Sequence, residues 1–571
     1  MRANAVASDL AGLGGKLHKS FNAVGVLVAE VPFSKIEQLA NDPEIAYVSP
    51  DREIETTGHV ETTTAAAQVR TAVTGMTLDG TGIGVAVLDS GMDVNHNLLK
   101  ASTGHPGIVY SQDFTGEGSV LDAYGHGTHV ASIIAGSNLV SNGAYRGVAP
   151  GAKLINLKVI DSTGRGNASN VIAAIDWCIA NQATYNLRVI NMSIGTVAKD
   201  SYWDDPICYA VENAFYAGIM VVTSAGNAGK DTSGRKVYGT INSPGISPFA
   251  LTVGALNTFG TDARSDDAVA SYSSKGPTRG YYESWGVKYY DNFIKPDLVA
   301  PGNKIIAARS NNDTGGSNKI LKTATSLAIG SHINVADKVM YMSGSSMAAP
   351  VATGAAALLF QAKPGLSVSL VKALLMYTAQ PLSGVNTLEQ GAGRINIDGA
   401  VKIAKLINTN TINIANLGDN MLTAAMPTQT STIYGQTCYW GKGVITNYVF
   451  LYGDDLMKKY HWIYDTWTPL FYGTYASGSF IYLDTFYVYG TVSKSAGVLA
   501  HNSVSQLASG SLVTQGTMLA DGTLIADGTL IADGTLIADG TMLCDGTLLS
   551  DGTIRVSAMV LGDNTICMLP Q

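Results

Sequence analysis

The stretch "GIGVAVLDS", residues 82–90, is a short apolar run that ends in an aspartate and a serine. Similar runs follow it, separated by segments with helical periodicity such as "HGTHVASIIAG" at 126–136 and "ASNVIAAIDWCIA" at 168–180. Near-continuous apolar strands that alternate with helices indicate a parallel sheet covered on both faces. From about residue 80 to 405 the sequence therefore predicts an α/β domain with a twisted parallel sheet and helices on both faces.

The bulk composition excludes several classes of protein. A chain of 571 residues is too long for one ordinary core, so two to four domains are expected. The net charge of −8 argues against nucleic acid or an anionic membrane as the main partner. No apolar run reaches the roughly 18 residues that a membrane-spanning helix needs, so no span is expected.

The termini and cysteines say less about compartment. The N-terminal sequence lacks the apolar core of about 7–15 residues that a signal peptide contains, so the protein either stays in the cell or has a signal upstream of this chain. The five cysteines form no CxxC pair, so a zinc site is not expected. Cys178 and Cys208 lie on successive predicted helices, where a disulfide and two buried free thiols fit equally well.

Three segments of the α/β region carry the residues of a nucleophilic hydrolase. Asp89 ends a buried strand in "VAVLDSG", and His126 stands where a Gly-rich turn enters a helix in "YGHGTHVASIIAG". Ser346 stands at a predicted helix start in "SGSSMAAP", with Pro350 in the first turn. Taken alone, each of these residues is most often a cap or turn residue. Their order along one α/β domain is that of an Asp-His-Ser triad.

These residue types suit acyl transfer. A serine hydroxyl is a poor nucleophile until a neighbouring base takes its proton. With an ordinary pKa of about 6.5, His126 can accept that proton at neutral pH and return it to the leaving amine. Asp89 would hold the imidazole in one tautomer and stabilise the imidazolium. Ser346 is therefore the predicted nucleophile.

The motifs "DSG", "HGTHVA" and "GSSMAAP" resemble the three catalytic signatures of the subtilisin-like serine proteases, or subtilases. The resemblance covers about residues 10–405 and departs at Ser345, where the family usually has threonine. A fourth motif, "SAGNAG", places Asn227 where the family's oxyanion-hole amide sits. The resemblance implies that Asn227 and the backbone N–H of Ser346 stabilise the tetrahedral oxyanion, and that no cofactor is required for the chemistry.

The resemblance also implies where a substrate peptide binds. "STGRGNAS" and "NMSIGT" occupy the family's two edge segments, between which a peptide would pair as an added strand. The alternative interpretation is that both are ordinary Gly-rich loops. Arg165 would favour acidic residues a few positions before the cut. The residues assigned to substrate binding are Gly164, Arg165 and Gly166 in one segment and Ser193, Ile194 and Gly195 in the other.

The region ahead of the α/β domain predicts a zymogen. Residues 1–57 are interpreted as a small α+β unit with strands in "FNAVGVLVAEV" and "EIAYVSPD" and, between them, a helix in "SKIEQLAND" with a Ser34–Glu37 capping box. The unit resembles the inhibitory prodomain of secreted subtilases, with its first strand absent or altered. The resemblance implies an intramolecular inhibitor that is cut off near 55–65. Residues 58–80 are expected as a linker and the start of the mature chain, and 81–407 as the subtilisin-like catalytic domain.

Two β-rich regions are expected after the catalytic domain. Residues 408–500 are rich in aromatic side chains, which fits polysaccharide binding by stacking or, preferably, a β-rich core. In residues 501–571, glycine recurs every six residues from Gly516 to Gly552, usually after aspartate. Each repeat fits either a strand with an Asp-Gly turn or part of a parallel coil. A structural array is preferred over calcium binding by the repeats.

Together these features predict a secreted or cell-surface serine endopeptidase, made as a zymogen, that acts on protein or peptide substrates and removes its own prodomain. The alternative is a catalytically silent surface or binding protein whose C-terminal repeats carry the function. A lipase or esterase is not favoured, because the G-x-S-x-G elbow and the order Ser, Asp, His are both missing around Ser346. The family often carries structural calcium, but the sequence does not identify its ligands.

Overall fold

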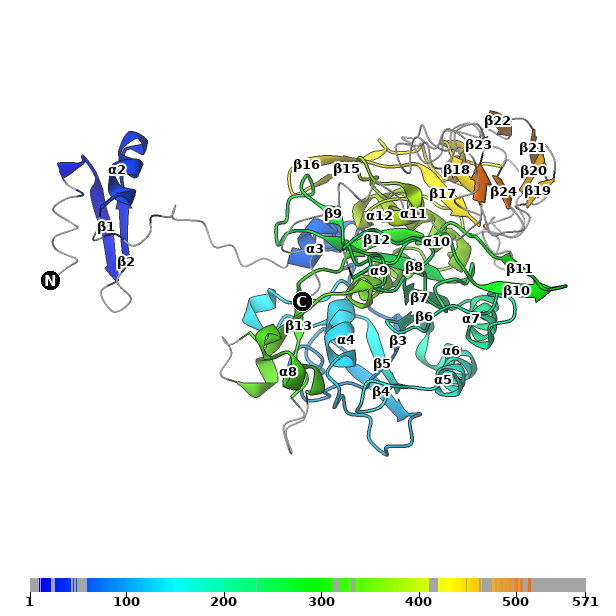
Figure 1. Ribbon diagram of the computed structural model, residues 1–571, viewed down its shortest axis with the longest axis horizontal. Helices are drawn as coiled ribbons and strands as arrows, with labels where there is room; N and C mark the ends of the chain where they lie inside the picture. The colour runs from blue at the N-terminus through cyan, green and yellow to red at the C-terminus, as the bar shows by residue number, and fades with distance from the viewer. Residues whose placement is uncertain are drawn as a thin grey trace. The chain divides into compact units, whose positions relative to one another are not determined.

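The computed structural model describes residues 59–464, with gaps at 233, 312–317, 330–333, 410–418, 448 and 462–463. It also describes parts of 10–48 and, between 475 and 514, the backbone of several strands. The chain divides into two compact units, Met1–Thr57 and Gly58–Gln571 (Figure 1). The predicted hexapeptide repeat from Gly516 to Gly552 lies outside the described residues.

The first unit contains a β-hairpin and a short helix. β1 (Lys16–Phe21) pairs antiparallel with β2 (Val26–Glu30), and η1 (Phe33–Lys35) leads into α2 (Ile36–Ala40). A strand therefore precedes β2, where the resemblance implies an absent or altered one. The predicted capping box does not form, because the 3-10 turn already begins at Phe33 and places Ser34 inside it. The second predicted strand, at 44–51, falls mostly on residues outside those described.

The second unit is built on a mostly parallel eight-stranded sheet, as predicted. The strand order is β12-β8-β7-β6-β3-β5-β4, and β9 pairs antiparallel with β8. Strands β3, β7 and β8 are buried along their whole length, which is why they form continuous apolar runs in the sequence. The strands are β3 (Gly84–Asp89), β4 (Ile108–Asp113), β5 (Lys153–Lys158), β6 (Leu187–Met192), β7 (Met220–Ser224), β8 (Leu251–Asn257), β9 (Ala268–Val269) and β12 (Leu298–Pro301).

Helices cover both faces of this sheet. α4 (Gly127–Ala135) packs against α9 (Ser345–Ala362), and α5 (Ala168–Ala180) packs against α7 (Pro206–Tyr216). In Figure 1 the first pair lies on one side of the sheet and the second pair on the other. Cys178 of α5 and Cys208 of α7 are both free and buried, so they form no disulfide. α10 (Val368–Tyr377) and α12 (Ile397–Ala404) extend the layer that contains α9.

Smaller elements complete the described part of the chain. The short helices are α3 (His59–Thr63), η2 (Gln68–Thr71), η3 (Ser141–Gly143), α6 (Gln182–Tyr185), α8 (Lys319–Thr323), η4 (Thr325–Leu327), η5 (Val335–Asp337), α11 (Thr387–Gln390) and α13 (Asp455–Lys458). The remaining strands are β10 (Tyr281–Ser284), β11 (Val287–Tyr290), β13 (Ile305–Ala308), β14 (Val339–Met342), β15 (Thr430–Ile433), β16 (Gln436–Tyr439), β17 (Gly443–Thr446), β18 (Val449–Tyr452), β19 (Tyr475–Ser477), β20 (Phe480–Leu483), β21 (Phe486–Tyr489), β22 (Val492–Ser495), β23 (Val498–His501), β24 (Val504–Gln506) and β25 (Leu512–Thr514).

The start of the second unit, expected as a linker, is folded onto the rest of that unit. Glu61 in α3 is buried and forms ion pairs with Arg70 and Arg146. Its Oε2 lies 2.9 Å from Nε of Arg146. The main-chain oxygen of Thr64 accepts from the N–H of Ile397 at 3.1 Å. Loss of one partner from a buried ion pair is strongly destabilising. These contacts therefore hold the segment in place from α3 onward.

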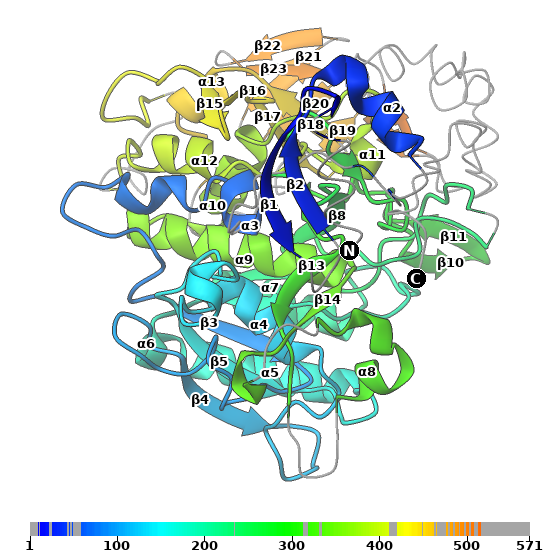
Figure 2. The same cartoon turned by 90° about the vertical axis from the view of Figure 1, so that its left-hand side faces the viewer.

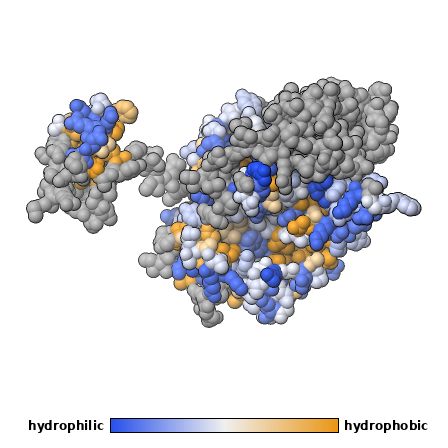
Figure 3. Space-filling view, in the orientation of Figure 1, coloured by the Kyte–Doolittle hydropathy of each residue, from blue (hydrophilic) through white to orange (hydrophobic). Residues whose placement is uncertain are grey.

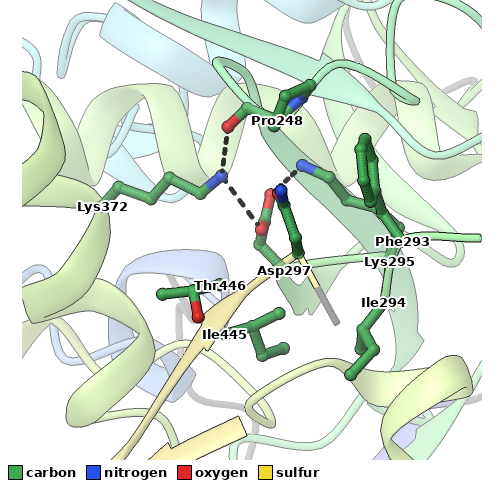
Figure 4. A pocket seen from close by; sticks show the side chains of 9 residues that line it. Pro248, Phe293, Ile294, Lys295, Asp297, Lys372, Ile445 and Thr446 are labelled. Atoms are coloured by element: carbon green, nitrogen blue, oxygen red, sulfur yellow. Dashed lines mark hydrogen bonds and ion pairs between the residues drawn. The ribbon is translucent and has the colours of Figure 1, made fainter. Parts of the chain in front are cut away.

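Two buried lysines share one aspartate where β17 packs on α10. Lys295 Nζ lies 2.7 Å from Asp297 Oδ2, and Lys372 Nζ lies 3.1 Å from Asp297 Oδ1 (Figure 4). Both ammonium groups also donate to the main-chain oxygen of Ala250, at 3.0 and 2.9 Å. Burial lowers the pKa of Lys295 to about 7, although the charge of Asp297 opposes this. The cluster joins α10 to the sheet, because the N–H of Thr252 in β8 donates to Asp297 Oδ2 at 2.7 Å.

We expect Asp297→Asn to lower the free energy of unfolding by about 3–5 kcal/mol, because it leaves two lysines buried without their counter-charge. Chemical denaturation followed by circular dichroism would measure this. The matched control is Asp454→Asn, whose partners Lys442 and Lys458 are 31% and 37% exposed. Such an exposed pair is worth about 0–1 kcal/mol. Equal losses in the two variants would contradict a structural role for the buried cluster.

Candidate active site

The predicted catalytic residues gather at the carboxyl edge of the sheet. Asp89 is the last residue of β3, Ser193 follows β6, and Asn227 lies just past β7. These three strands are parallel neighbours, so their carboxyl ends lie along one edge. His126 caps the N-terminal end of α4 and Ser346 lies in the first turn of α9, two helices that pack together (Figures 1 and 2).

An aspartate–histidine pair forms the first part of the site. His126 Nδ1 lies 2.7 Å from Asp89 Oδ1, which also accepts from the N–H of Ser90 at 2.8 Å. Asp89 is buried, and its Oδ2 has no hydrogen-bond partner within the described part of the chain. An ionised carboxylate only accepts hydrogen bonds, so Nδ1 of His126 carries a proton. The other ring nitrogen, Nε2, is then free to accept one.

A second buried carboxylate, Asp122, clamps the turn that presents His126. Its Oδ1 accepts from Ser90 Oγ at 2.8 Å and from the N–H of Gly125 at 2.7 Å. Its Oδ2 accepts from the N–H of Thr128 at 2.8 Å. The chain is thus fixed on both sides of His126. Sequence reasoning does not single out Asp122, although an aspartate just before a helix start is a recognisable signal for a carboxylate that binds helical N–H groups.

The two histidines of the "HGTH" motif have different environments. Burial lowers the pKa of His126, but the charge of Asp89, its hydrogen bond and the charge of Asp122 together outweigh burial and raise it above the ordinary value. His129 is fully buried, with Nε2 3.2 Å from main-chain oxygens of β13 and β14. Burial lowers the pKa of His129 to about 3, so this side chain stays neutral. Of the two, only His126 is placed for proton transfer.

Two reciprocal hydrogen bonds tie Ser346 to the end of β6. Pro350 is the sixth residue of α9, one turn deeper than the expected position in the first turn. Proline has no N–H, so the carbonyl of Ser346, four residues earlier, lacks its helical donor. The hydroxyl of Ser193 donates to that carbonyl at 2.7 Å. In return, the Ser346 hydroxyl donates to the main-chain oxygen of Ser193 at 3.0 Å.

Ser345 orients the amide of Asn227. Asn227 Oδ1 accepts from the N–H of Ser345 at 2.9 Å and lies 3.0 Å from its Oγ. Nδ2 of the amide therefore points away from these donors. Gly344 adopts a φ of 157°, a conformation essentially restricted to glycine, and a Cβ there would lie 3.2 Å from Asn227 Nδ2. Serine in place of the family's usual threonine keeps the hydroxyl that this contact uses.

The structure places both predicted substrate segments next to these residues. Gly164 packs so closely on the ring of Tyr124, two residues before His126, that a Cβ on it would lie 2.4 Å from the ring. The loop is closed on Asp161, whose Oδ1 accepts from the N–H of Arg165 at 3.0 Å. The carbonyl of Arg165 accepts from the N–H of Asp161 at 2.7 Å. The N–H of Gly164 also donates to the main-chain oxygen of Asp161 at 3.0 Å, so main-chain pairing on this side would fall to the Gly164 carbonyl and to Gly166. The other segment begins at Ser193.

Within the described residues there is no group of three or more His, Cys, Asp or Glu side chains that could hold a metal ion, so no calcium ligands are assigned. Across the same residues, none of the helices is both long enough and apolar enough to span a bilayer.

Comparisons with known proteins identify the family. The model of the subtilase family matches residues 80–396. Serine protease AprX of Bacillus subtilis (strain 168) is 35% identical over 393 residues, which cover 68% of this chain and 81% of that protein. Subtilisin E of the same strain is 30% identical over 390 residues, or 68% of this chain and 84% of that protein. The extracellular serine proteinase of Thermus sp. (strain Rt41A) is 33% identical over 378 residues, 64% and 74% of the two chains. The chain belongs to the subtilase family and is a serine endopeptidase.

Proposed function

We propose that the protein hydrolyses peptide bonds through an acyl-enzyme on Ser346, as a secreted protease made as a zymogen. The observation that carries the proposal is the 2.7 Å hydrogen bond from His126 to the buried carboxylate of Asp89. It leaves Nε2 of His126 as a base at the same edge of the sheet as Ser346. The proposed roles are base for His126, orienting carboxylate for Asp89, nucleophile for Ser346 and oxyanion donor for Asn227.

The reaction begins when the Ser346 hydroxyl changes its hydrogen-bond acceptor. A hydroxyl can donate one hydrogen bond, and in this structure the Ser346 hydroxyl donates it to the Ser193 carbonyl. Oγ therefore rotates toward His126 Nε2 when substrate binds. His126 takes the proton as Oγ attacks the scissile carbonyl carbon, and Asp89 stabilises the imidazolium. His126 then protonates the leaving amine. Water, activated by the same nitrogen, hydrolyses the ester on Ser346 and restores the hydroxyl.

Charge on the tetrahedral intermediate is met by two donors. The oxyanion accepts from Nδ2 of Asn227 and from the backbone N–H of Ser346, which lies in the first turn of α9 where helical N–H groups are unpaired. The helix dipole adds to the same stabilisation. The substrate chain would run between Gly164–Gly166 and Ser193–Gly195 as an added strand.

The N-terminal unit is proposed as an intramolecular inhibitor that the enzyme removes by itself. From His59 onward the chain is bonded to the body of the second unit. His59 Nδ1 lies 3.0 Å from Asp262 Oδ1, and Glu61 is paired with two arginines. A cut after this point would break a packed element. We therefore expect the cut before His59, at the early end of the interval 55–65. The relative named as an extracellular serine proteinase supports secretion.

We expect Ser346→Ala to lower kcat on peptides on the order of 10⁶-fold and to leave the N-terminal unit attached. Intact mass and N-terminal sequencing of the purified protein would show both effects beside a peptidase assay. The control is Ser169→Ala, an exposed residue of α5, which should process and hydrolyse like the wild type. Removal of residues 1–57 from the Ser346→Ala protein expressed alone would contradict self-processing.

The pH profile tests the second carboxylate. Because the pKa of His126 is raised, the acid limb of kcat/KM should have its midpoint above 6.5. Asp122→Asn removes a negative charge that favours the protonated imidazole, so the midpoint should move to lower pH. It also replaces an acceptor of the Thr128 N–H, and kcat should fall by about tenfold to a hundredfold as His126 shifts. Asp113→Asn is the control and should leave the limb in place, because that carboxylate accepts from Thr115 and Gly118 of its own loop. An unmoved limb in Asp122→Asn would contradict the assignment.

Asn227→Ala should lower kcat by about 10²–10³, the loss known for a subtilisin asparagine in this role, with little change in KM. Ser345→Thr should keep full activity because it retains the hydroxyl beside Asn227 Oδ1. Ser345→Ala should lower kcat by less than Asn227→Ala does, since the backbone N–H of residue 345 still orients the Asn227 amide. Steady-state kinetics on one peptide substrate would compare the three variants. An unchanged kcat in Asn227→Ala would remove this residue from the mechanism.

A further inference from the structure

A two-stranded arm of aromatic residues leaves the catalytic unit and takes no part in the chemistry above. β10 and β11 pair antiparallel, and Trp285 and Gly286 form the turn between them. Figures 1 and 2 show this hairpin extending outward beyond the packed helices and strands. The side chain of Trp285 is fully exposed at 100%, and Tyr282 is 50% exposed. The arm therefore presents large aromatic rings to solvent.

The tip of the arm adopts a conformation that its sequence does not favour. Trp285 has a φ of 53° and Gly286 a φ of 76°, the two positive values of a type I′ turn. Asparagine, aspartate or glycine normally fills the first of these positions, and a bulky residue at positive φ is an outlier. Burial of the Trp285 side chain does not offset this conformational cost, because the side chain is fully exposed in the free protein. Such a residue is expected where the side chain acts on a partner.

Side-chain contacts within the arm order its rings in the free protein. The rings of Tyr282 and Tyr289 are stacked, with centroids 5.0 Å apart and planes 11° from parallel. On the other face, the guanidinium of Arg279 lies 3.7 Å from the ring centre of Tyr290. A surface that is already ordered loses little entropy on binding, so its exposed rings are available at low cost.

The base of the arm is joined to the chain that leaves the substrate-binding edge. The N–H of Ser201 donates to the carbonyl of Tyr281 at 2.8 Å. The loop that contains Ser201 starts at Thr196, directly after Gly195, and exposes Val197 and Trp203 by 71% and 70%. We call Val197, Trp203, Tyr282 and Trp285 the arm surface. It begins at the end of the predicted substrate segment and ends at the tip of the hairpin.

We propose that the arm surface is an exosite that binds unfolded segments of protein substrates, rich in apolar side chains, outside the bond that is cut. This inference rests on the proposed function, because it takes Ser193–Gly195 as part of the substrate-binding edge. A substrate chain that leaves this edge meets Val197 and Trp203 next. The exosite would raise affinity for long, unfolded chains over short peptides through a second point of attachment.

Two features favour a polypeptide as the occupant. The loop with Val197 and Trp203 follows directly on Ser193–Gly195, the segment proposed to pair with a substrate chain. The tip of the arm is pale in Figure 3, because tyrosine and tryptophan have intermediate hydropathy, and blue hydrophilic side chains lie beside it. Aromatic rings with a polar group are the side chains that dominate protein–protein contacts.

The test compares a long and a short substrate. Trp285→Asn suits the turn better than tryptophan, so the hairpin stays folded when Trp203→Ala is added. We expect this double variant to lower kcat/KM on a reduced, carboxymethylated protein by at least about fivefold, mainly through KM. Its kcat/KM on a chromogenic tetrapeptide should stay within about twofold of the wild type. Tyr439→Ala, which removes an equally exposed ring from β16, is the matched control and should change neither value.

Each other outcome overturns the exosite. Equal kcat/KM for the unfolded protein in the double variant and the wild type would do so and leave the proposed function standing. A wild type that cuts neither substrate would overturn both. Binding of Ser346→Ala to cellulose or to phosphatidylcholine vesicles, lost on adding Trp285→Asn, with no binding to the unfolded protein, would assign the arm surface to a polysaccharide or a lipid instead.

Discussion

The hydrogen bond between His126 Nδ1 and Asp89 is the interaction on which the site depends, because it decides which ring nitrogen carries the proton. A carboxylate at the end of a central strand can hold that bond only if the turn before α4 is fixed. Asp122 fixes it by accepting N–H groups on both sides of His126. The sheet supplies a rigid edge, and the two buried carboxylates give one histidine a defined tautomer and a raised pKa.

Ser346, the proposed nucleophile, is held by two hydrogen bonds to Ser193. A proline inside α9 frees the carbonyl of Ser346, and the Ser193 hydroxyl takes the place of the missing helical donor. The carbonyl of the same serine accepts a hydrogen bond from the Ser346 hydroxyl, which holds that hydroxyl in place. Ser345 fixes the amide of Asn227 on the other side. The two neighbouring serines thus have different contacts: Ser346 bonds to Ser193, and Ser345 bonds to Asn227.

Much of the fold and site could be predicted because the signals are local. Strands buried on both faces form apolar runs, and short motifs at strand ends and helix starts identify the proposed site residues Asp89, His126, Ser346 and Asn227. Asp122 belongs to no catalytic motif: it accepts from the nearby N–H groups of Gly125 and Thr128, and only the fold brings it to Ser90, 32 residues away. The capping box at Ser34 failed because the preceding 3-10 turn moved the helix start. The segment at Glu61 has no apolar periodicity, and its folding rests on ion pairs with remote arginines.

The most direct test of the central claim is labelling with a fluorophosphonate, which forms a P–O bond to an activated serine and releases fluoride. Peptide mapping should find one adduct, on Ser346, and the labelling rate should rise with pH to a plateau with a midpoint above 6.5, as the raised pKa of His126 requires. Asp89→Asn should slow labelling by about 10⁴-fold. An adduct on another serine, or a rate that Asp89→Asn leaves unchanged, would contradict the account.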